Sequence, residues 1–353
     1  MIGDWLARKE ICICAGSGGV GKTTTSAAIA LGMAARGKKV AVLTIDPARR
    51  LANSLGLPEL GNEERRVEAD VDGELWAMML DPKRTFDELI EWHAPDERTR
   101  DAVLSNRIYQ ELSSAVAGSQ EYMAMEKLLE LHQEGSYDLL VLDTPPTRNA
   151  LDFIDAPKRL AAFIDSRSLH FFTAPGVLGL KVFGRGTGVL FSVMKRATGI
   201  DLLEDLSGFF SAFGNMTGGF RERAVRVNEL LADRRTSFVL ITSPRADAID
   251  EAAWFHHRLL DAGLPFAGVV ANRVRPKAAS GSPGRDLEEL LGPPLAAKVG
   301  ELWQKERRLA ARDRKNLDDL RGRLGRKPMI EVPILDGDVH DLDGLRRMDE
   351  FLF

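Results

Sequence analysis

Cysteine is scarce in this sequence: only Cys12 and Cys14 occur among 353 residues, and both lie in one apolar run, residues 11–16. A disulfide framework is therefore excluded. The spacing of two residues predicts that both side chains lie on one face of a strand, where a free cysteine behaves as a small buried hydrophobe. The six histidines form no cluster at zinc-binding spacing, so we do not expect a zinc site.

The sequence also lacks a long apolar run and an excess of positive charge. No segment approaches the roughly 20 apolar residues that span a bilayer, and the first residues lack the apolar core of a signal peptide. We therefore expect a cytoplasmic protein without stable membrane insertion. The 48 basic and 52 acidic residues leave a formal charge of -4, which disfavours nucleic acid as a partner.

Short apolar runs indicate several buried strands. They are residues 11–16, 39–46, 74–80, 137–143, 237–243, 265–272 and 329–335. Helical patterns lie between several of these runs, which is typical of right-handed βαβ units. The sequence thus predicts the α/β class, with a mostly parallel, twisted sheet covered by helices on both faces. Ligands of such sheets bind beyond the carboxyl ends of the strands.

Two stretches are too long to be simple crossovers, and both look helical. They are residues 82–136 and 151–232. We expect them to form a helical subdomain inserted into a sheet domain. That domain would consist of residues 1–81, 137–150 and 233–353.

Three segments outside the strands have patterns of their own. Tyr122, Met125, Leu128, Leu129 and His132 recur at helical spacing and predict an amphipathic helix. Residues 169–194 interleave aromatic and aliphatic side chains with glycine, which lowers helix stability, so we expect a mobile lobe there. Residues 305–327 are rich in charge and predict a solvated helix.

The strongest motif is the glycine-rich run that follows the first strand. Residues 16–23 read G-S-G-G-V-G-K-T and match the phosphate-loop pattern G-x-x-x-x-G-K-[ST] between a predicted strand and a predicted helix. Glycine lets successive backbone N–H groups turn toward phosphates, and the helix N-terminus adds positive potential. The sheet domain is therefore predicted to be a P-loop NTPase. Its nucleotide contacts would come from Gly16, Ser17, Gly18, Gly19, Val20, Gly21, Lys22, Thr23 and Thr24.

Within that loop, two side chains have specific expected roles. Lys22 should hold the β- and γ-phosphates, and the Thr23 hydroxyl should bind Mg²⁺. Asp143 ends a very apolar strand, where an acid that binds Mg²⁺ through water is expected. Asp46 ends another strand and could orient or deprotonate the attacking water. Thr23, Asp46 and Asp143 form the predicted metal site; the alternative for either acid is that it merely caps a helix.

The nature of the base follows from the end of the sixth run. GTP-binding relatives of the P-loop proteins carry N-K-x-D there, whereas this chain has Asn272 and Arg273 without that Asp. Adenine is therefore favoured, since an Asn side chain pairs with an adenine edge through one donor and one acceptor.

Taken in order, the motifs "GSGGVGKTTT", "LTIDPARRLANSLG", "VLDTPPTRNALDF", "LITSPRADAIDEA", "VVANRV" and "VPILDGDVHDLDGLRR" resemble those of the ArsA-type anion-pump ATPases and their tail-anchored-protein-targeting relatives. The resemblance implies a dimerising, Mg²⁺-dependent ATPase with a helical lobe beside the nucleotide domain. It also implies that Asp46 and Asp143 belong to two switch segments. The adenine would be covered by Asn272, Arg273, Pro333, Leu335 and Asp336.

The chain departs from this family at several positions. Ser17 stands where the family's loop has a lysine that reaches the partner subunit's phosphates, and "PTRN" replaces "PTGH" in the second switch, which makes Arg148 a candidate catalytic cation. Arg49 and Arg50 are further candidates. The C-x-x-C pair that binds zinc in the targeting factors is absent, as are thiols for arsenite, so metalloid pumping is not expected.

Three functions stay open at this point. The first is an ATP-hydrolysing dimeric switch that couples its nucleotide state to the helical lobe. The second is a catalytically weak ATP-binding subunit that pairs with a paralogue bearing the loop lysine; Ser17 favours it. The third is a chaperone for hydrophobic membrane-protein segments, favoured by the apolar residues 171–194. The partners would accordingly be a second copy or a paralogue, together with a hydrophobic client in the third case.

Overall fold

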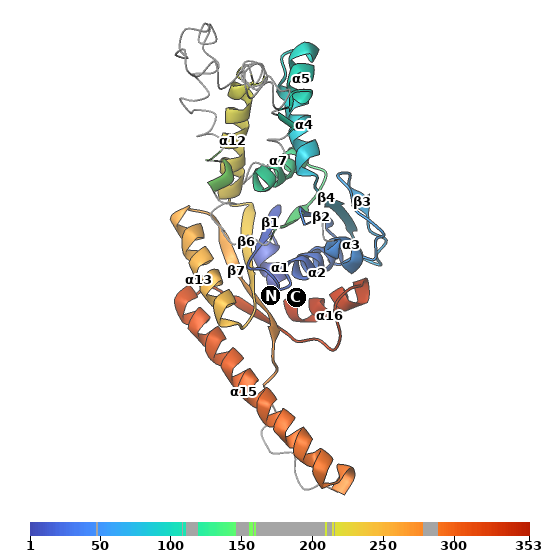
Figure 1. Ribbon diagram of the computed structural model, residues 1–353, viewed down its shortest axis with the longest axis vertical. Helices are drawn as coiled ribbons and strands as arrows, with labels where there is room; N and C mark the ends of the chain where they lie inside the picture. Colours follow the sequence, from blue (N-terminus) through green and yellow to red (C-terminus); the bar gives the residue numbers. More distant parts are fainter. Residues whose placement is uncertain are drawn as a thin grey trace, which may run out of the picture. The chain divides into compact units, whose positions relative to one another are not determined.

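The computed structural model describes residues 1–46, 49–107, 109–110, 119–145, 155–157, 159, 209, 214, 216–277 and 289–353. The chain divides into two compact units (Figure 1). The first, here called the sheet unit, comprises Met1–Met79, Gly135–Ala150 and Ala232–Phe353. The second, the helical unit, comprises Leu80–Glu134 and Leu151–Leu231. Arg148 and the glycine-rich stretch 169–194 lie outside the described residues.

One eight-stranded sheet forms the centre of the sheet unit, with the strand order β3-β4-β2-β5-β1-β6-β7-β8. The strands are β1 (Ile11–Ala15), β2 (Lys39–Thr44), β3 (Arg65–Arg66), β4 (Glu74–Met79), β5 (Leu139–Asp143), β6 (Thr236–Thr242), β7 (Phe266–Val274) and β8 (Met329–Pro333). All neighbours pair in parallel except β3 and β4. The predicted α/β class is confirmed. Only β3 was not predicted, because its two arginines are exposed and have no apolar pattern.

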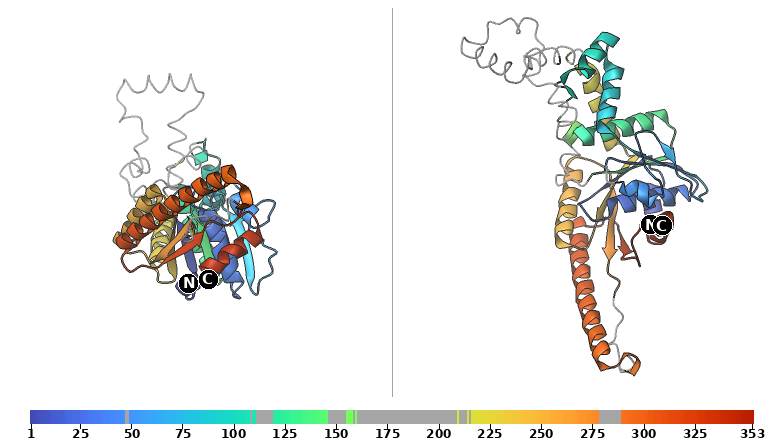
Figure 2. Two further views of the ribbon diagram at one scale, coloured as in Figure 1. Left: turned by 90° about the horizontal axis from the view of Figure 1, so that it is seen from below. Right: turned by 45° about the vertical axis from the view of Figure 1, so that its right-hand side comes forward.

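Helices cover both faces of this sheet (Figures 1 and 2). The helices of the sheet unit are α1 (Ile2–Leu6), α2 (Lys22–Ala34), α3 (Arg50–Ser54), α13 (Ala246–Asp261), α15 (Pro293–Leu324) and α16 (Leu342–Leu352). The chain moves from β1 to β2 in one direction along the sheet and from β6 to β7 in the other. Right-handed crossovers therefore place α2 and α13 on opposite faces. The reversal lies beside β1, so a ligand site is expected at the carboxyl end of that strand.

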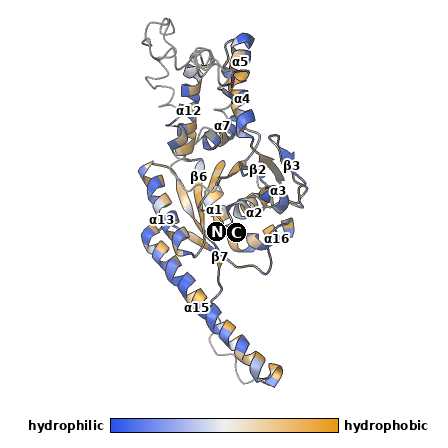
Figure 3. Cartoon of the chain, in the orientation of Figure 1, coloured by the Kyte–Doolittle hydropathy of each residue, from blue (hydrophilic) through white to orange (hydrophobic). Residues whose placement is uncertain are grey.

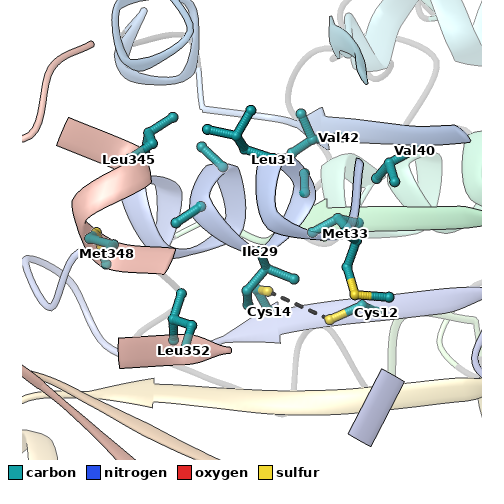
Figure 4. Packing of buried hydrophobic residues seen from close by; sticks show 14 of the residues in the cluster. Cys12, Cys14, Ile29, Leu31, Met33, Val40, Val42, Leu345, Met348 and Leu352 are labelled. Carbon is teal, nitrogen blue, oxygen red and sulfur yellow. Dashed lines mark hydrogen bonds between the residues drawn. The ribbon is translucent and has the colours of Figure 1, made fainter. Parts of the chain in front are cut away.

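The main core lies between the sheet, α2 and α16 (Figure 4). Cys12 and Cys14 are free and fully buried, with their sulfur atoms 3.9 Å apart. The hydrogen bond with Cys14 and burial raise the pKa of the Cys12 thiol. The predicted role of both cysteines as core residues is confirmed. α16 approaches α2 closely at Gly32, where an added Cβ would lie 2.4 Å from the Phe353 ring. A side chain at this position would therefore require the Asp349 carboxylate and the Phe353 ring to move.

The helical unit contains α4 (Pro82–His93), α5 (Glu97–Leu104), α7 (Ser119–Glu134) and nearly all of α12 (Thr217–Ala232). Residues 122–129 of α7 are all buried, so the predicted apolar stripe was too narrow. Burial extends to two charged residues, Glu126 and Lys127. The apolar pattern of the sequence could not indicate this, because it counts only apolar side chains. The Glu126 carboxylate accepts hydrogen bonds from the Tyr122 hydroxyl and, at 2.7 Å, from Arg223 Nε of α12.

Arg223 also contacts the exposed ring of Trp92 on α4, with its guanidinium carbon 4.9 Å from the ring centroid. A buried ion pair is costly to form but more costly to break, because the remaining charge has no partner. This pair therefore links α7 to α12 inside the helical unit. None of the helices in the described ranges combines the length and the apolar character that a membrane span requires.

We expect Arg223→Met to lower the free energy of unfolding by about 3–5 kcal/mol, because Glu126 would stay charged and buried without its cation. Chemical denaturation measures the loss. The control is Arg226→Met on the same helix, whose ion pair with Glu222 is exposed, and which should change stability by no more than about 0.5 kcal/mol. Equal losses for the two variants would contradict a structural role for the buried pair.

Candidate nucleotide site

The glycine-rich loop connects the end of β1 to the start of α2 in a backbone shape that requires glycine. Gly19 and Gly21 have φ angles of 77° and 89°, which L-residues with a side chain rarely adopt. At Gly16 an added Cβ would lie 2.0 Å from the carbonyl oxygen of Ile241. Gly21 is the N-cap of α2 and provides no side-chain cap. The first N–H groups of α2 are thus available to an anion from outside the helix.

Lys22 is the first residue of α2, and its side chain folds back over the loop. Its Nζ donates a hydrogen bond to the Ser17 carbonyl oxygen at 3.0 Å, and the residue is only 6% exposed. Burial lowers the pKa of Lys22, and the nearby carboxylates of Asp143 and Asp46 oppose this effect. The lysine is therefore a desolvated cation between the loop and two acids.

Asp143, at the carboxyl end of β5, is the most deeply buried acid of the site. One carboxylate oxygen, Oδ2, accepts hydrogen bonds from the hydroxyls of Thr23 at 2.7 Å and Thr44 at 3.0 Å. The other, Oδ1, is buried and has no hydrogen-bond partner among the residues that the structure describes. Burial raises the pKa of Asp143 to about 6, although both hydroxyls act in the opposite direction. A buried carboxylate oxygen without a partner, next to a threonine hydroxyl, fits a divalent cation or its bound water.

Thr44 is a member of this cluster that sequence reasoning missed. It precedes Asp46 by two residues at the end of β2, and its hydroxyl also accepts a hydrogen bond from the Asp46 N–H at 3.2 Å. Because β2 pairs with β5 in register at Thr44 and Asp143, the two strand ends are held together. The available signal was a polar residue that ends an apolar strand beside another strand ending in an acid.

Asp46 lies between this cluster and the start of α3. Its carboxylate is 4.0 Å from the Arg50 guanidinium, and it lines a cavity of about 300 Å³ together with Thr44, Arg49 and Glu59. Arg49 precedes α3 in a left-handed conformation, with φ at 54°. A carboxylate at the wall of a cavity of this volume has room to position a water molecule. Arg49 and Arg50 were the two candidate cations of this segment, and Arg50 forms the ion pair with Asp46.

A second cavity, of about 560 Å³, opens beside the N-terminus of α2. Of the predicted nucleotide contacts, it is lined by Gly21, Thr24, Asn272, Arg273, Pro333 and Leu335. Its other lining residues are Arg50, Asn53, Ser54, Ile334, Gly337, Asp338, Val339, His340 and Met348. Asp336 is not part of the lining; its carbonyl oxygen accepts a hydrogen bond from Arg347 at 3.0 Å. The cavity is large enough for a base and its sugar.

Asn272 and Arg273, at the end of β7, are tied to the glycine-rich loop. Asn272 Nδ2 donates to the Val20 carbonyl oxygen at 2.9 Å, and Arg273 donates to the Gly19 carbonyl oxygen at 3.1 Å. Arg273 has a φ of 61°, and its N–H donates to Asn272 Oδ1 at 2.9 Å. The Asn272 amide keeps one N–H and one lone pair, so the pairing with an adenine edge is still chemically available.

The structure thus brings most of the predicted residues to one edge of the sheet. The loop with its lysine, Thr23, Asp46 and Asp143 lie at the carboxyl ends of β1, β2 and β5, and Asn272 and Arg273 at that of β7. The loop residues Ser17, Gly18 and Gly19 are at least partly exposed there. Across the described part of the chain, no group of three or more Cys, His, Asp or Glu side chains has the arrangement of a metal cluster.

Comparison with known proteins identifies the family. A family model described as "Anion-transporting ATPase" matches residues 9–285. The ATPase get3 of Neurospora crassa is 25% identical over 343 residues, which are 96% of this chain and 88% of the relative. The ATPase GET3 of Malassezia globosa is 27% identical over 264 residues, covering 74% of this chain and 71% of that protein. The putative arsenical pump-driving ATPase 1 of Aquifex aeolicus is 24% identical over 352 residues, or 98% and 78% of the two chains.

The family model covers most of the chain, including the glycine-rich loop, Asp46 and Asp143. The resemblance is therefore confirmed: the chain belongs to the anion-transporting ATPase family and is an ATPase.

Proposed function

We propose that this ATPase binds ATP with Mg²⁺ at the glycine-rich loop and works as a dimer whose nucleotide state changes the helical unit. The observation that supports the site most strongly is the buried Asp143 carboxylate, with one oxygen held by Thr23 and Thr44 and the other without a partner. An open helix N-terminus and a buried lysine lie beside it. Together they supply donors for phosphate and oxygen ligands for a cation.

In this proposal Lys22 leaves the Ser17 carbonyl and binds the β- and γ-phosphates, where its charge gains a stronger partner. The Thr23 hydroxyl and the free oxygen of Asp143 hold Mg²⁺, the latter through water, with Asp46 at the edge of the same site. Bound Mg²⁺ would neutralise charge on the phosphate oxygens. Thr23 and Thr44 hold Oδ2 of Asp143 in place, which would leave Oδ1 available to a cation or its bound water.

Asp46 positions the attacking water and accepts its proton, since it lines a cavity large enough for water and lies near the phosphate loop. Arg50 is close enough to hold the Asp46 carboxylate before nucleotide binds. The adenine and ribose occupy the cavity lined by Asn272, Pro333 and Leu335. Arg273 then acts through the loop, because it bonds to the Gly19 carbonyl rather than to the base.

A second proposal concerns the partner subunit, and it rests on Ser17. A serine hydroxyl is several ångströms shorter than a lysine side chain and carries no charge, so it cannot cross a dimer interface to the partner's phosphates. The missing cation is worth about 10³ to 10⁵ in rate where it has been measured in related phosphoryl transfers. It would come from Arg49, Arg50 or Arg148 of this chain, or from a paralogue that keeps the loop lysine.

Metalloid transport is not proposed, although one relative is named an arsenical pump-driving ATPase. Arsenite requires accessible thiols, and both cysteines of this chain are fully buried in β1. A chaperone for hydrophobic segments stays a prediction, because residues 171–194, on which it rests, lie outside the described residues.

Asp46→Asn should bind ATP with nearly unchanged affinity and lose hydrolysis by at least roughly 10²-fold, because the amide cannot accept the proton of the attacking water. Calorimetry and a phosphate-release assay measure the two quantities. The control is Lys22→Ala, which should weaken binding itself. If Asp46→Asn weakened ATP binding as much as Lys22→Ala does, the assigned division of roles would be wrong.

The buried charge of Asp143 predicts a pH-dependent stability of the protein without metal or nucleotide. Its pKa is about 6 instead of 3.8, so the native state binds a proton that the unfolded state has lost between these pH values. The unfolding free energy therefore falls as the pH rises through this window. Asp143→Asn avoids the buried charge, and it should be more stable than the parent at pH 7.5 by on the order of 1–3 kcal/mol.

Chemical denaturation in the presence of a chelator measures this difference at pH 7.5 and again at pH 5, where it should shrink. With Mg²⁺ and ATP present, the order should reverse, because only the parent has the carboxylate ligand. A variant that is less stable than the parent at pH 7.5 without metal would refute the proposed cost of burying this charge.

The proposal of an unlike partner predicts slow ATP turnover by the isolated chain and at least a roughly tenfold increase when a paralogue with the loop lysine is added. Ser17→Lys should restore part of this activity without the paralogue, because the lysine can then reach the second subunit's phosphates. The measurement is the steady-state ATPase rate against protein concentration. Fast turnover by the isolated chain, lost in Arg50→Ala or Arg148→Ala, would show that an arginine of this chain has replaced the lysine.

A further inference from the structure

Helix α15 is much longer than the surface that covers it. Its 32 residues correspond to about 48 Å. The C-terminal part packs against α13 and β7, and Leu317, Leu320 and Leu324 are buried there. The N-terminal part extends beyond the sheet (Figures 1 and 2). Near that end the exposed large apolar side chains are Leu290 (80%), Leu291 (41%), Leu295 (49%) and Leu302 (61%).

These exposed leucines continue the face of α15 that is buried further along. Leu302 and Leu320 are 18 residues apart, which is five helical turns, so they lie on the same side of the helix. Leu320 is fully buried and Leu302 is 61% exposed. Leu295 and Leu302 are seven residues apart and share this side with Leu309. The apolar face therefore extends along most of the helix. Leu317, Leu320 and Leu324 are buried, whereas Leu295 and Leu302 are exposed.

The charges of the covered part show what kind of surface fits this helix. There the arginines beside the buried leucines pair with carboxylates of the covering elements. Arg323 binds Asp250 of α13 at 2.7 Å, and Arg314 binds Glu331 of β8 at 2.9 Å. Leucine contacts flanked by arginine–carboxylate pairs thus hold α15 to its own domain.

The N-terminal part of α15 also has leucines next to lysine and arginine side chains. It differs from the C-terminal part because these cations have no carboxylate partner on another described element. A shallow hollow on its surface is lined by Lys298, Glu301, Leu302, Gln304, Lys305 and Arg308. Within the described ranges, no carboxylate of another element forms an ion pair with Lys298, Lys305 or Arg308. Figure 3 shows this part of α15 as hydrophilic residues interrupted by apolar ones. Its positive charge contrasts with the formal charge of -4 for the whole chain.

We propose that the N-terminal part of α15, residues 293–308, is a docking surface for an acidic amphipathic helix of a partner protein. The apolar side chains of that helix would cover Leu295 and Leu302, and its Asp or Glu residues would pair with Lys298, Lys305 and Arg308. The covered part of α15 has this same arrangement, since α13 supplies both apolar contacts and the carboxylate of Asp250. A second copy fits less well, because the same surfaces would bring like charges together.

The test uses the full chain and a fluorescent synthetic helix in which leucines at every third or fourth position are flanked by glutamates. A matched peptide has lysines in place of the glutamates. In anisotropy titrations the acidic peptide should bind with a Kd at least about tenfold lower than that of the basic peptide, and higher salt should reduce the difference. Lys298→Glu/Lys305→Glu/Arg308→Glu should reverse this preference, and Leu295→Gln/Leu302→Gln should weaken both peptides.

The control variant, Arg8→Glu/Arg65→Glu/Arg326→Glu, changes the same net charge at exposed positions outside α15 and should keep the preference for the acidic peptide. No preference in the parent chain, or a preference that survives the charge reversal on α15, would overturn the proposal. Co-sedimentation with phosphatidylglycerol vesicles that depends on Leu295 and Leu302 would assign the surface to a bilayer instead. Loss of self-association in the leucine variant would assign it to a second copy.

Discussion

The site of this ATPase depends on one buried carboxylate, that of Asp143. It lies at the end of β5, where burial disfavours its charge. Two hydroxyls, those of Thr23 in α2 and Thr44 in β2, donate hydrogen bonds to one of its oxygens. This arrangement fixes the start of α2 and the end of β2 relative to β5. It also leaves the second oxygen without a partner, which is tolerable in a native protein where an ion or water uses it. Lys22 precedes Thr23 at the start of α2, and Asp46 follows Thr44 by two residues, so both lie beside this cluster.

The glycine-rich loop is held from the opposite side by β7. Asn272 and Arg273 donate to the carbonyl oxygens of Val20 and Gly19, so the loop is a rigid link between the phosphate side and the larger cavity. Gly21 is required there, since an added Cβ would lie 2.4 Å from the Asn272 amide nitrogen. A nucleotide that fills both regions would therefore act on one connected set of backbone groups. Such a connection is a physical basis for coupling base recognition to phosphate binding.

The two units of the chain use buried charge in different ways. In the helical unit, Glu126 and Arg223 form a buried ion pair that links α7 to α12. In the sheet unit, Asp143 and Lys22 are both desolvated, and their pKa values move toward the neutral forms. A buried charge that already has its partner needs no ligand, whereas a site with unsatisfied charge gains stability when its ligand binds. The proposed ATP and Mg²⁺ would supply that missing compensation.

Much of this protein could be determined from the sequence because its signals are local. Seven apolar runs predicted seven strands, and one contiguous loop between a strand and a helix predicted the nucleotide site, since glycines and a lysine at fixed spacing act within a few residues of each other. The acids Asp46 and Asp143 could be named because each ends its own strand. Ser17 was recognisable as a departure because the surrounding motif is otherwise complete.

The tertiary structure decided what depends on residues distant in the chain. Thr44 joins the site only because β2 pairs with β5, and the larger cavity exists only because the turn after β8 approaches the end of β7. That Asp143 Oδ1 has no partner among the described residues is likewise seen only in the folded structure. The charge-rich residues 305–327 predicted a solvated helix. Sequence periodicity indicates that α15 has an apolar face, but it does not indicate which elements pack against that face. Which part of that face is buried is set by where α13 and the sheet end, and this is a property of packing rather than of local sequence.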